Sequence, residues 1–107
     1  MEQRRTRRFQ LQLPLAVIRS GATRVELAGC TKNISSGGVL FTTEREPNFG
    51  GPIEYVITLT DNGTKAVNLR CMGKIVRAGR ADPGREEASP PYRIAATLER
   101  YEFVRDR

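Results

Sequence analysis

The stretch IEYVITLTDNGTKAVNLRCMGKIVRAG, residues 53–79, decides the fold class. Its first part, residues 53–60, has an apolar residue at every second position, which is the period of a half-buried strand. The predicted inward-facing residues of this part are Ile53, Tyr55, Ile57 and Leu59. The polar turn DNGTK at residues 61–65 leads into a second such run, which is typical of a β-hairpin. The second run, residues 66–79, is long for one strand, and Gly73 in its middle predicts a bulge or bend.

Alternating apolar and polar residues also predict strands on both sides of this hairpin. These strands occupy residues 9–18, 24–33, 39–43 and 92–99. Together with the hairpin they make six short strands without a connecting helix. Such a pattern is typical of an antiparallel sheet that closes into a small barrel and so removes its edges. Pro14 cannot donate to a strand ladder and is therefore expected at an edge or a bulge.

The C-terminal residues 98–106 carry a less regular pattern. Leu98, Tyr101 and Val104 recur at every third residue, which predicts a short helix. Tyr101 and Phe103 also alternate, as they would in a strand. The sequence as a whole predicts an all-β fold, a small six-stranded antiparallel β-barrel with a short C-terminal helix.

The length of 107 residues fits one domain, because a second hydrophobic core would need a longer chain. We expect a single domain over residues 1–107, with residues 1–8 as a flexible arginine-rich segment and residues 9–107 as the barrel and helix. Residues 80–91 are rich in charge, Pro and Gly and are expected to form a mobile loop. No apolar run approaches the ~20 residues that span a bilayer, and no signal peptide is visible, so a cytoplasmic location is expected.

The charge balance points to an anionic partner. The chain has 18 Lys and Arg residues against 12 Asp and Glu residues, a formal net charge of +6 at pH 7. Most of the excess is arginine, whose planar guanidinium suits phosphate oxygens and base edges. Nucleic acid, a nucleotide or an anionic membrane would fit this charge. Trp is absent and aromatic residues make up 7%, which argues against a single-strand binder that stacks bases on aromatic rings.

Neither a catalytic set nor a metal site can be assembled from the sequence. The chain has no His, and its two cysteines, Cys30 and Cys71, lack the CxxC spacing of zinc ligands. Ser35 and Ser36 have no base that could activate them as nucleophiles. We therefore expect no enzymatic activity, no metal and no cofactor. Cys30 and Cys71 are expected to be buried, reduced thiols.

Two short motifs stand out from this background. Arg4 and Arg8 have the spacing RxxxR directly before the first predicted strand, and a second motif, [D/N]xSxxG, lies between the second and third strands. The second motif consists of Asn33, Ser35 and Gly38. Taken alone, the arginines are explained as a solvated basic tail. Taken alone, NISSGG is explained as a polar hairpin turn, in which Asn and Ser bond their own backbone and Gly supplies a positive φ.

Together the two motifs resemble the signature motifs of PilZ domains, which are small β-barrels that bind cyclic di-GMP. RFQLQLPLAV after the arginines, GVLFTTE after the second motif and GKIVRAG further on also resemble strands of that family. The resemblance implies a cyclic di-GMP receptor that signals through an unidentified partner protein. It implies that the ligand is bound by Arg4, Arg8, Asn33, Ser35 and Gly38.

Arginine suits each part of such a ligand. A guanidinium fork can meet O6 and N7 of guanine, stack on a purine face, or donate charge-assisted hydrogen bonds to phosphate. Asn33 and Ser35 would add neutral hydrogen bonds, and Gly38 would let the backbone approach the ligand closely. Family members that bind an intercalated ligand pair tend to carry another arginine just before RxxxR. Gln3 holds that position here, so the resemblance leaves one or two ligands per chain open and favours one.

Two alternatives stay open at this point. The chain could be a PilZ-like protein-interaction module without nucleotide binding, which uses its basic strip on a protein. It could also be a nonspecific nucleic-acid binder, which the net charge favours and the low aromatic content disfavours.

Overall fold

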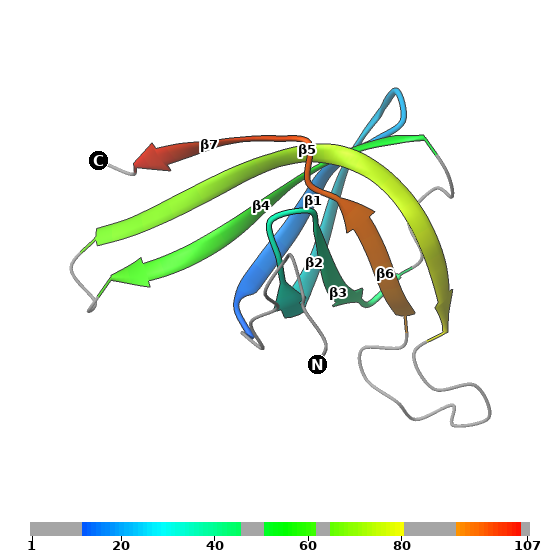
Figure 1. Cartoon of the computed structure of the whole chain (residues 1–107), viewed down its shortest axis with the longest axis horizontal. Helices are drawn as coiled ribbons and strands as arrows, with labels where there is room; N and C mark the ends of the chain where they lie inside the picture. Colours follow the sequence, from blue (N-terminus) through cyan, green and yellow to red (C-terminus); the bar gives the residue numbers. More distant parts are fainter. Residues whose placement is uncertain (1–11, 46–50, 62–64, 81–91, 106–107) are drawn as a thin grey trace, which may run out of the picture.

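The computed structural model describes residues 12–45, 51–61, 65–80 and 92–105. These residues form seven antiparallel strands and no helix (Figure 1). The strands are β1 (Pro14–Ser20), β2 (Thr23–Ile34), β3 (Gly38–Thr43), β4 (Pro52–Asp61), β5 (Lys65–Arg80), β6 (Tyr92–Thr97) and β7 (Arg100–Arg105). Over the same residues there is no helix with the length and apolar character needed to cross a membrane.

Six of the seven strands close into a barrel. Neighbouring strands follow the order β4-β1-β2-β3-β6-β5, and β5 also pairs with β4, so the sheet returns to its first strand. Closure gives each strand of the ring a neighbour on both sides, which is how small antiparallel barrels avoid open edges. The prediction of a six-stranded antiparallel barrel is confirmed.

Strands β4 and β5 form the predicted hairpin. Their register runs without interruption from Asp61 opposite Lys65 to the far end of β4. β5 has 16 residues and arches over the barrel (Figure 1). Its first half pairs with β4 on one side and with β7 on the other, and its second half pairs with β6. One long strand therefore belongs both to the barrel and to a three-stranded extension of it.

The predicted bulge of β5 does not lie at Gly73. The register shift of β5 lies further along the strand, between Ile75 and Arg77 in the pairing with β6. At Gly73 the backbone passes so close to Thr97 that an added Cβ would overlap the Thr97 carbonyl oxygen. Glycine is needed here because no side chain fits at the point where β5 leaves β7 and joins β6.

The barrel interior is built from alternate residues of the strands. Tyr55 and Ile57 are fully enclosed, Ile53 is buried, and Leu59 packs against the edge of the core, as the alternation predicts. The rings of Phe41 and Tyr55 lie 5.5 Å apart, centre to centre. The buried hydrophobic residues are Leu15, Val17, Leu27, Val39, Phe41, Ile53, Tyr55, Ile57, Cys71, Ile75, Ile94 and Ala96. Their burial holds the strand registers, because a slip by one residue would turn these side chains to water.

Pro14 lies at the first residue of a strand rather than at the predicted edge or bulge. It begins β1 and pairs with Cys30 of β2, whereas β4 joins β1 only from Leu15 onward. Its missing N–H therefore leaves no gap between two paired strands. The predicted flexible segment 1–8 lies outside the described residues, as does nearly all of the predicted mobile loop 80–91.

The predicted C-terminal helix is wrong. Residues Arg100–Arg105 form β7, which pairs with the first half of β5. Leu98, Tyr101 and Val104 have the spacing of a helix, but no helix forms here. β5 extends beyond β6, and its backbone groups there pair with the next segment of the chain as a strand. The alternation of Tyr101 and Phe103 places both side chains on the face that continues the barrel interior. The strand-like pattern in the sequence is therefore the one that forms.

Candidate functional site

The second motif lies at the turn between β2 and β3. Asn33 belongs to the end of β2, opposite Leu40 and directly after a register shift between the two strands. Ser35 and Gly38 flank the turn, and the backbone N–H of Ser35 donates to the Gly38 carbonyl oxygen at 2.9 Å. The structure thus brings Asn33, Ser35 and Gly38 together on one short hairpin connection.

The Ser35 side chain stabilises this turn from within. Its Oγ accepts a hydrogen bond from the N–H of Gly37 and donates one to the carbonyl oxygen of Gly38, both at 3.3 Å. The carbonyl oxygen of Gly37 accepts a further bond, 3.1 Å long, from the N–H of Leu98 between β6 and β7. The polar-turn interpretation of NISSGG is confirmed for Ser35, and the turn is anchored to a segment distant in the sequence.

Gly38 does not supply a positive φ. The described glycines with positive φ are Gly21 and Gly51. Gly38 instead pairs with Thr97 of β6, where an added Cβ would stand 2.9 Å from the carbonyl oxygen of Ala96. The close approach that glycine permits here is between β3 and β6. A close approach of Gly38 to a ligand stays a prediction.

Two open hollows border the turn. One, of about 490 Å³, is lined by Gln12, Lys32, Asn33 and Leu40. The other, of about 280 Å³, is lined by Ser35, Gly37, Gly38, Val39, Leu40, Val76, Ala95, Ala96 and Thr97. Leu40 lines both. The motif therefore lies between a polar hollow that carries a cation and a more apolar one.

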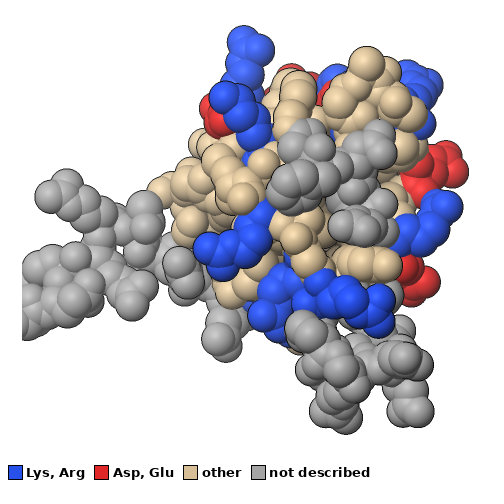
Figure 2. All heavy atoms as spheres, turned by 90° about the vertical axis from the view of Figure 1, so that its right-hand side faces the viewer, with Lys and Arg blue, Asp and Glu red and all other residues tan. Residues whose placement is uncertain are grey.

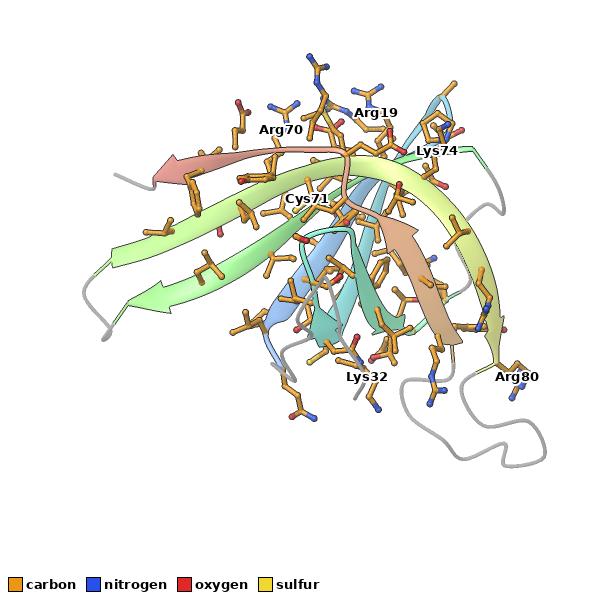
Figure 3. All side chains as sticks on the ribbon, in the orientation of Figure 1. Arg19, Lys32, Arg70, Cys71, Lys74 and Arg80 are labelled. Atoms are coloured by element: carbon orange, nitrogen blue, oxygen red, sulfur yellow. The ribbon has the colours of Figure 1, made fainter. Side chains whose placement is uncertain are left out.

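Cationic side chains gather at one end of the molecule. Figure 2 shows Lys and Arg side chains along its lower end, and Figure 3 places Lys32 and Arg80 at that end. Arg93 on β6 is exposed, and the Arg80 guanidinium carbon lies 5.8 Å from the centre of the Tyr92 ring. An anion that approaches this end meets positive charge from β2, β5 and β6.

A second set of arginines is held in ion pairs at the other end. Arg19 Nε lies 3.5 Å from Glu54 Oε1, Arg70 Nε bonds the other oxygen of Glu54, and Arg70 also reaches Glu102 at 3.2 Å. The hydrogen bond from Arg70 to Glu54, with the charges of both carboxylates, raises the pKa of Arg70. Figure 3 shows Arg19 and Arg70 away from Lys32. These arginines cross-link the outer face of the sheet rather than surround the motif turn.

The described residues hold no preformed metal site. They contain no group of three His, Cys, Asp or Glu side chains that could hold a metal ion. Both cysteines are free, with Cys71 buried as predicted and Cys30 half-buried. Burial raises the pKa of Cys71 to about 12, so this thiol stays protonated and unreactive at neutral pH. Burial, with a smaller contribution from Cys71, also raises the pKa of Tyr55.

The arginine motif falls outside the described residues. Arg4 and Arg8, together with Gln3 before them, precede the first described residue, Gln12. Their roles in ligand binding and the ligand count derived from Gln3 therefore stay predictions.

Two other residues beside the motif, Lys32 and Val76, are not among the predicted site residues. Lys32 directly precedes Asn33, so its position in the sequence was the available signal. Val76 is large and apolar but 61% exposed, and it lines the same hollow as Gly38. Val76 lies near Gly38 because β3 pairs with β6 and β6 pairs with β5. Such a contact follows from barrel closure and has no local signature.

Comparison with curated proteins and with solved structures finds no match. Comparison with protein families matches residues 2–89 to the PilZ domain. The matched span covers well over half of the 107 residues and includes both motifs, with the motif turn between β2 and β3. The chain therefore belongs to the PilZ domain family.

Proposed function

We propose that this PilZ domain is a receptor for cyclic di-GMP, which changes its surface on binding and passes the signal to a partner protein. PilZ domains are a family of cyclic di-GMP receptors and act by binding rather than by catalysis. Both motifs are intact in this chain, at Arg4 and Arg8 and at residues 33–38. A cytoplasmic location is in keeping with the two free thiols.

The ligand presents two guanine bases and two phosphates, and the proposed site offers a partner for each. Arg4 and Arg8 would donate to guanine O6 and N7 or to phosphate oxygens. Asn33, half-buried at the rim of its hollow, can both donate and accept neutral hydrogen bonds. Lys32 in the same hollow adds a point charge that suits a phosphate.

The observation that carries the proposal is the anchored position of the motif turn. Hydrogen bonds of Ser35 within the turn, and of Leu98 to Gly37, hold Asn33 beside an open hollow. Polar groups that are already held in place lose little freedom when a ligand binds, which favours affinity. Because the Ser35 hydroxyl is engaged in the turn, its contribution is to support the site, with spare acceptor capacity for the ligand.

Isothermal titration calorimetry of the folded protein tests this function, with cyclic di-AMP and GTP as comparison ligands. We expect micromolar or tighter affinity for cyclic di-GMP, about −8 kcal/mol or better. Cyclic di-AMP should bind weakly because adenine lacks the O6 acceptor that an arginine fork reads. No heat of binding at ligand concentrations far above micromolar would contradict the receptor function.

The same titration reports the number of ligands. We expect one cyclic di-GMP per chain, because Gln3 stands where an additional arginine accompanies a ligand pair. An endpoint of two ligands per chain would overturn this count while leaving the receptor function intact.

A matched pair of variants tests the motif turn. Asn33→Ala should weaken binding about two- to tenfold, the scale of one neutral hydrogen bond. Asn68→Ala on β5 makes the same chemical change outside both hollows and should leave the affinity unchanged. Equal effects of the two substitutions would remove Asn33 from the site.

A protein-interaction module without nucleotide binding is the second candidate, and the exposed side chains of Tyr101 and Phe103 favour it. The protein-interaction alternative predicts a folded protein that does not bind cyclic di-GMP and still associates with another protein. Binding of single-stranded oligonucleotides in place of cyclic di-GMP would instead favour the nucleic-acid alternative.

A further inference from the structure

β7 leaves a strand edge open. Within the described residues β5 is its sole neighbour, and the strand order of the sheet ends at β7. Figure 1 shows β7 along the outer side of β5, reaching away from the barrel. Its pairing with β5 is regular from Arg100 to Arg105, without a bulge or a proline to protect the edge. An edge of this kind is a template for another strand.

Aromatic side chains are exposed on one face of this edge. Tyr101 is 60% and Phe103 64% exposed, and their rings pack edge to face at 6.2 Å. In the pairing of β7 with β5, Tyr101 lies opposite Cys71 and Phe103 lies opposite Leu69. The two rings therefore extend the face of the sheet that lines the barrel interior. The apolar surface therefore continues to the very edge of the sheet, where a monomer leaves it in water.

The opposite face of the same edge carries charges of alternating sign. Glu54 bonds Arg70, Arg70 bonds Glu102, and the row stops at Glu102. Arg100, two positions before Glu102, makes no ion pair within the described part of the chain. β7 thus offers both an acid and a base on the face that lies opposite its aromatic residues.

We propose that β7 pairs antiparallel with β7 of a second copy of this chain, around a two-fold axis at Tyr101. In a continuous antiparallel sheet, directly opposite residues point to the same face, which limits the possible centres of symmetry. A centre at Glu102 would set two carboxylates opposite each other, and a centre at Phe103 would set Glu102 opposite Val104. A centre at Tyr101 sets Arg100 opposite Glu102 of the second copy, twice.

The centre at Tyr101 also joins the aromatic side chains. Tyr101 then lies opposite Tyr101 of the second copy, and Phe103 lies diagonal to it, so four rings meet on one face. Opposite charges and aromatic pairs that face each other across strands both stabilise a sheet. β7 carries both members of each of these cross-strand pairs. The partner that its open edge fits is therefore a second copy of the same chain. Around this centre only Arg100, Tyr101 and Glu102 face β7 of the second copy, because β7 begins at Arg100. The dimer should therefore be weak and should form as concentration rises.

Sedimentation velocity over two orders of magnitude in protein concentration tests the dimer. The wild type should pass from monomer to dimer as the concentration rises. Arg100→Glu makes both charged positions of the pairing acidic, and Glu102→Arg makes both basic. Each variant alone should stay monomeric because like charges then face each other. An equimolar mixture of the two variants should recover the dimer, because an acidic strand then meets a basic one.

Arg93→Glu on β6 is the matched control, since it makes the same charge change on a strand that does not pair with β7. It should dimerise as the wild type does. Circular dichroism and thermal melting establish that every variant is folded. A wild type that is monomeric at every concentration, a mixture that stays monomeric, or an open series of larger species would each overturn the proposal.

Discussion

The phenolic hydroxyl of Tyr55 on β4 donates a hydrogen bond to the carbonyl oxygen of Thr97 at the end of β6, 3.2 Å away. β4 and β6 are not neighbours in the sheet, so this bond crosses the barrel interior. The Thr97 side-chain hydroxyl also accepts from the N–H of Lys74 on β5 and donates to Glu99, at 2.8 and 2.9 Å. Thr97 is therefore a junction that ties β4, β5 and β6 together.

Removing the hydroxyl of Tyr55 should weaken this junction. Tyr55→Phe keeps the buried ring and its packing on Phe41 and loses one hydrogen bond, so the free energy of unfolding should fall by about 1 kcal/mol. Urea unfolding measures the change. Tyr101→Phe removes the same group from an exposed ring and should have no effect at concentrations where the protein is monomeric. Identical midpoints for Tyr55→Phe and the wild type would contradict this role.

The two glycines of the motif turn should respond differently to alanine. At Gly38 the new Cβ would stand 2.9 Å from the Ala96 carbonyl oxygen, so β3 and β6 must shift, at a cost of about 1–3 kcal/mol. At Gly37 nothing lies within 4 Å of an added Cβ, and Gly37→Ala should stay within ~0.5 kcal/mol of the wild type. Thermal unfolding of both variants makes the comparison, and a Gly38→Ala variant as stable as Gly37→Ala would refute it.

Loss of either motif arginine should weaken ligand binding. Arg8→Ala should reduce the affinity for cyclic di-GMP by ~1–3 kcal/mol, the scale of a bidentate guanine contact, and Arg4→Ala should behave alike. The free energy of unfolding should change by no more than ~0.5 kcal/mol. Arg8→Lys keeps the charge without the planar fork and should restore little of the affinity. If the lysine variant binds as tightly as the wild type, Arg8 acts as a point charge and does not read guanine.

Stability should fall in alkaline solution. The pKa of Cys71 rises from 9.0 to about 12 on burial, and the pKa of Tyr55 rises as well. The unfolded chain therefore releases these protons at lower pH than the folded one, so folding loses stability as pH climbs from about 9 towards 12. Urea unfolding across this range should show a shallower decline for Cys71→Ala than for the wild type. Parallel declines would mean that Cys71 does not titrate on unfolding.

Local patterns in the sequence were enough to predict much of the fold. The hairpin around residues 61–65 and the burial of Tyr55 follow from a period of two and a turn, both of which act between near neighbours. The end of the chain could not be predicted in the same way. Tyr101 fits both a helical and a strand pattern, and the strand forms because β5 extends past β6, which is a property of the whole barrel.

The candidate site, too, has features that the local sequence predicts and features that depend on distant strands. The spacing of Asn33, Ser35 and Gly38 identifies the motif, and the structure places all three at one turn. The bond from Leu98 to that turn and the position of Val76 beside it depend on which distant strands become neighbours. Neither has a signature within its own stretch of sequence.

The unbroken register of β4 and β5 sets an order of events during folding. Only three residues separate these strands and their register has no shift, whereas the equally local pairings of β1 with β2 and of β2 with β3 each contain one. β1 meets β4 and β3 meets β6 across much longer stretches of chain. Closing a short loop loses less chain entropy, and local pairs form faster than distant ones. We therefore expect the β4–β5 hairpin to form before the barrel closes, with the amides of the β4–β5 ladder protected before those of the β3–β6 ladder in pulse-labelled hydrogen exchange. In kinetic terms, β5 is the template on which both the barrel and its extension assemble.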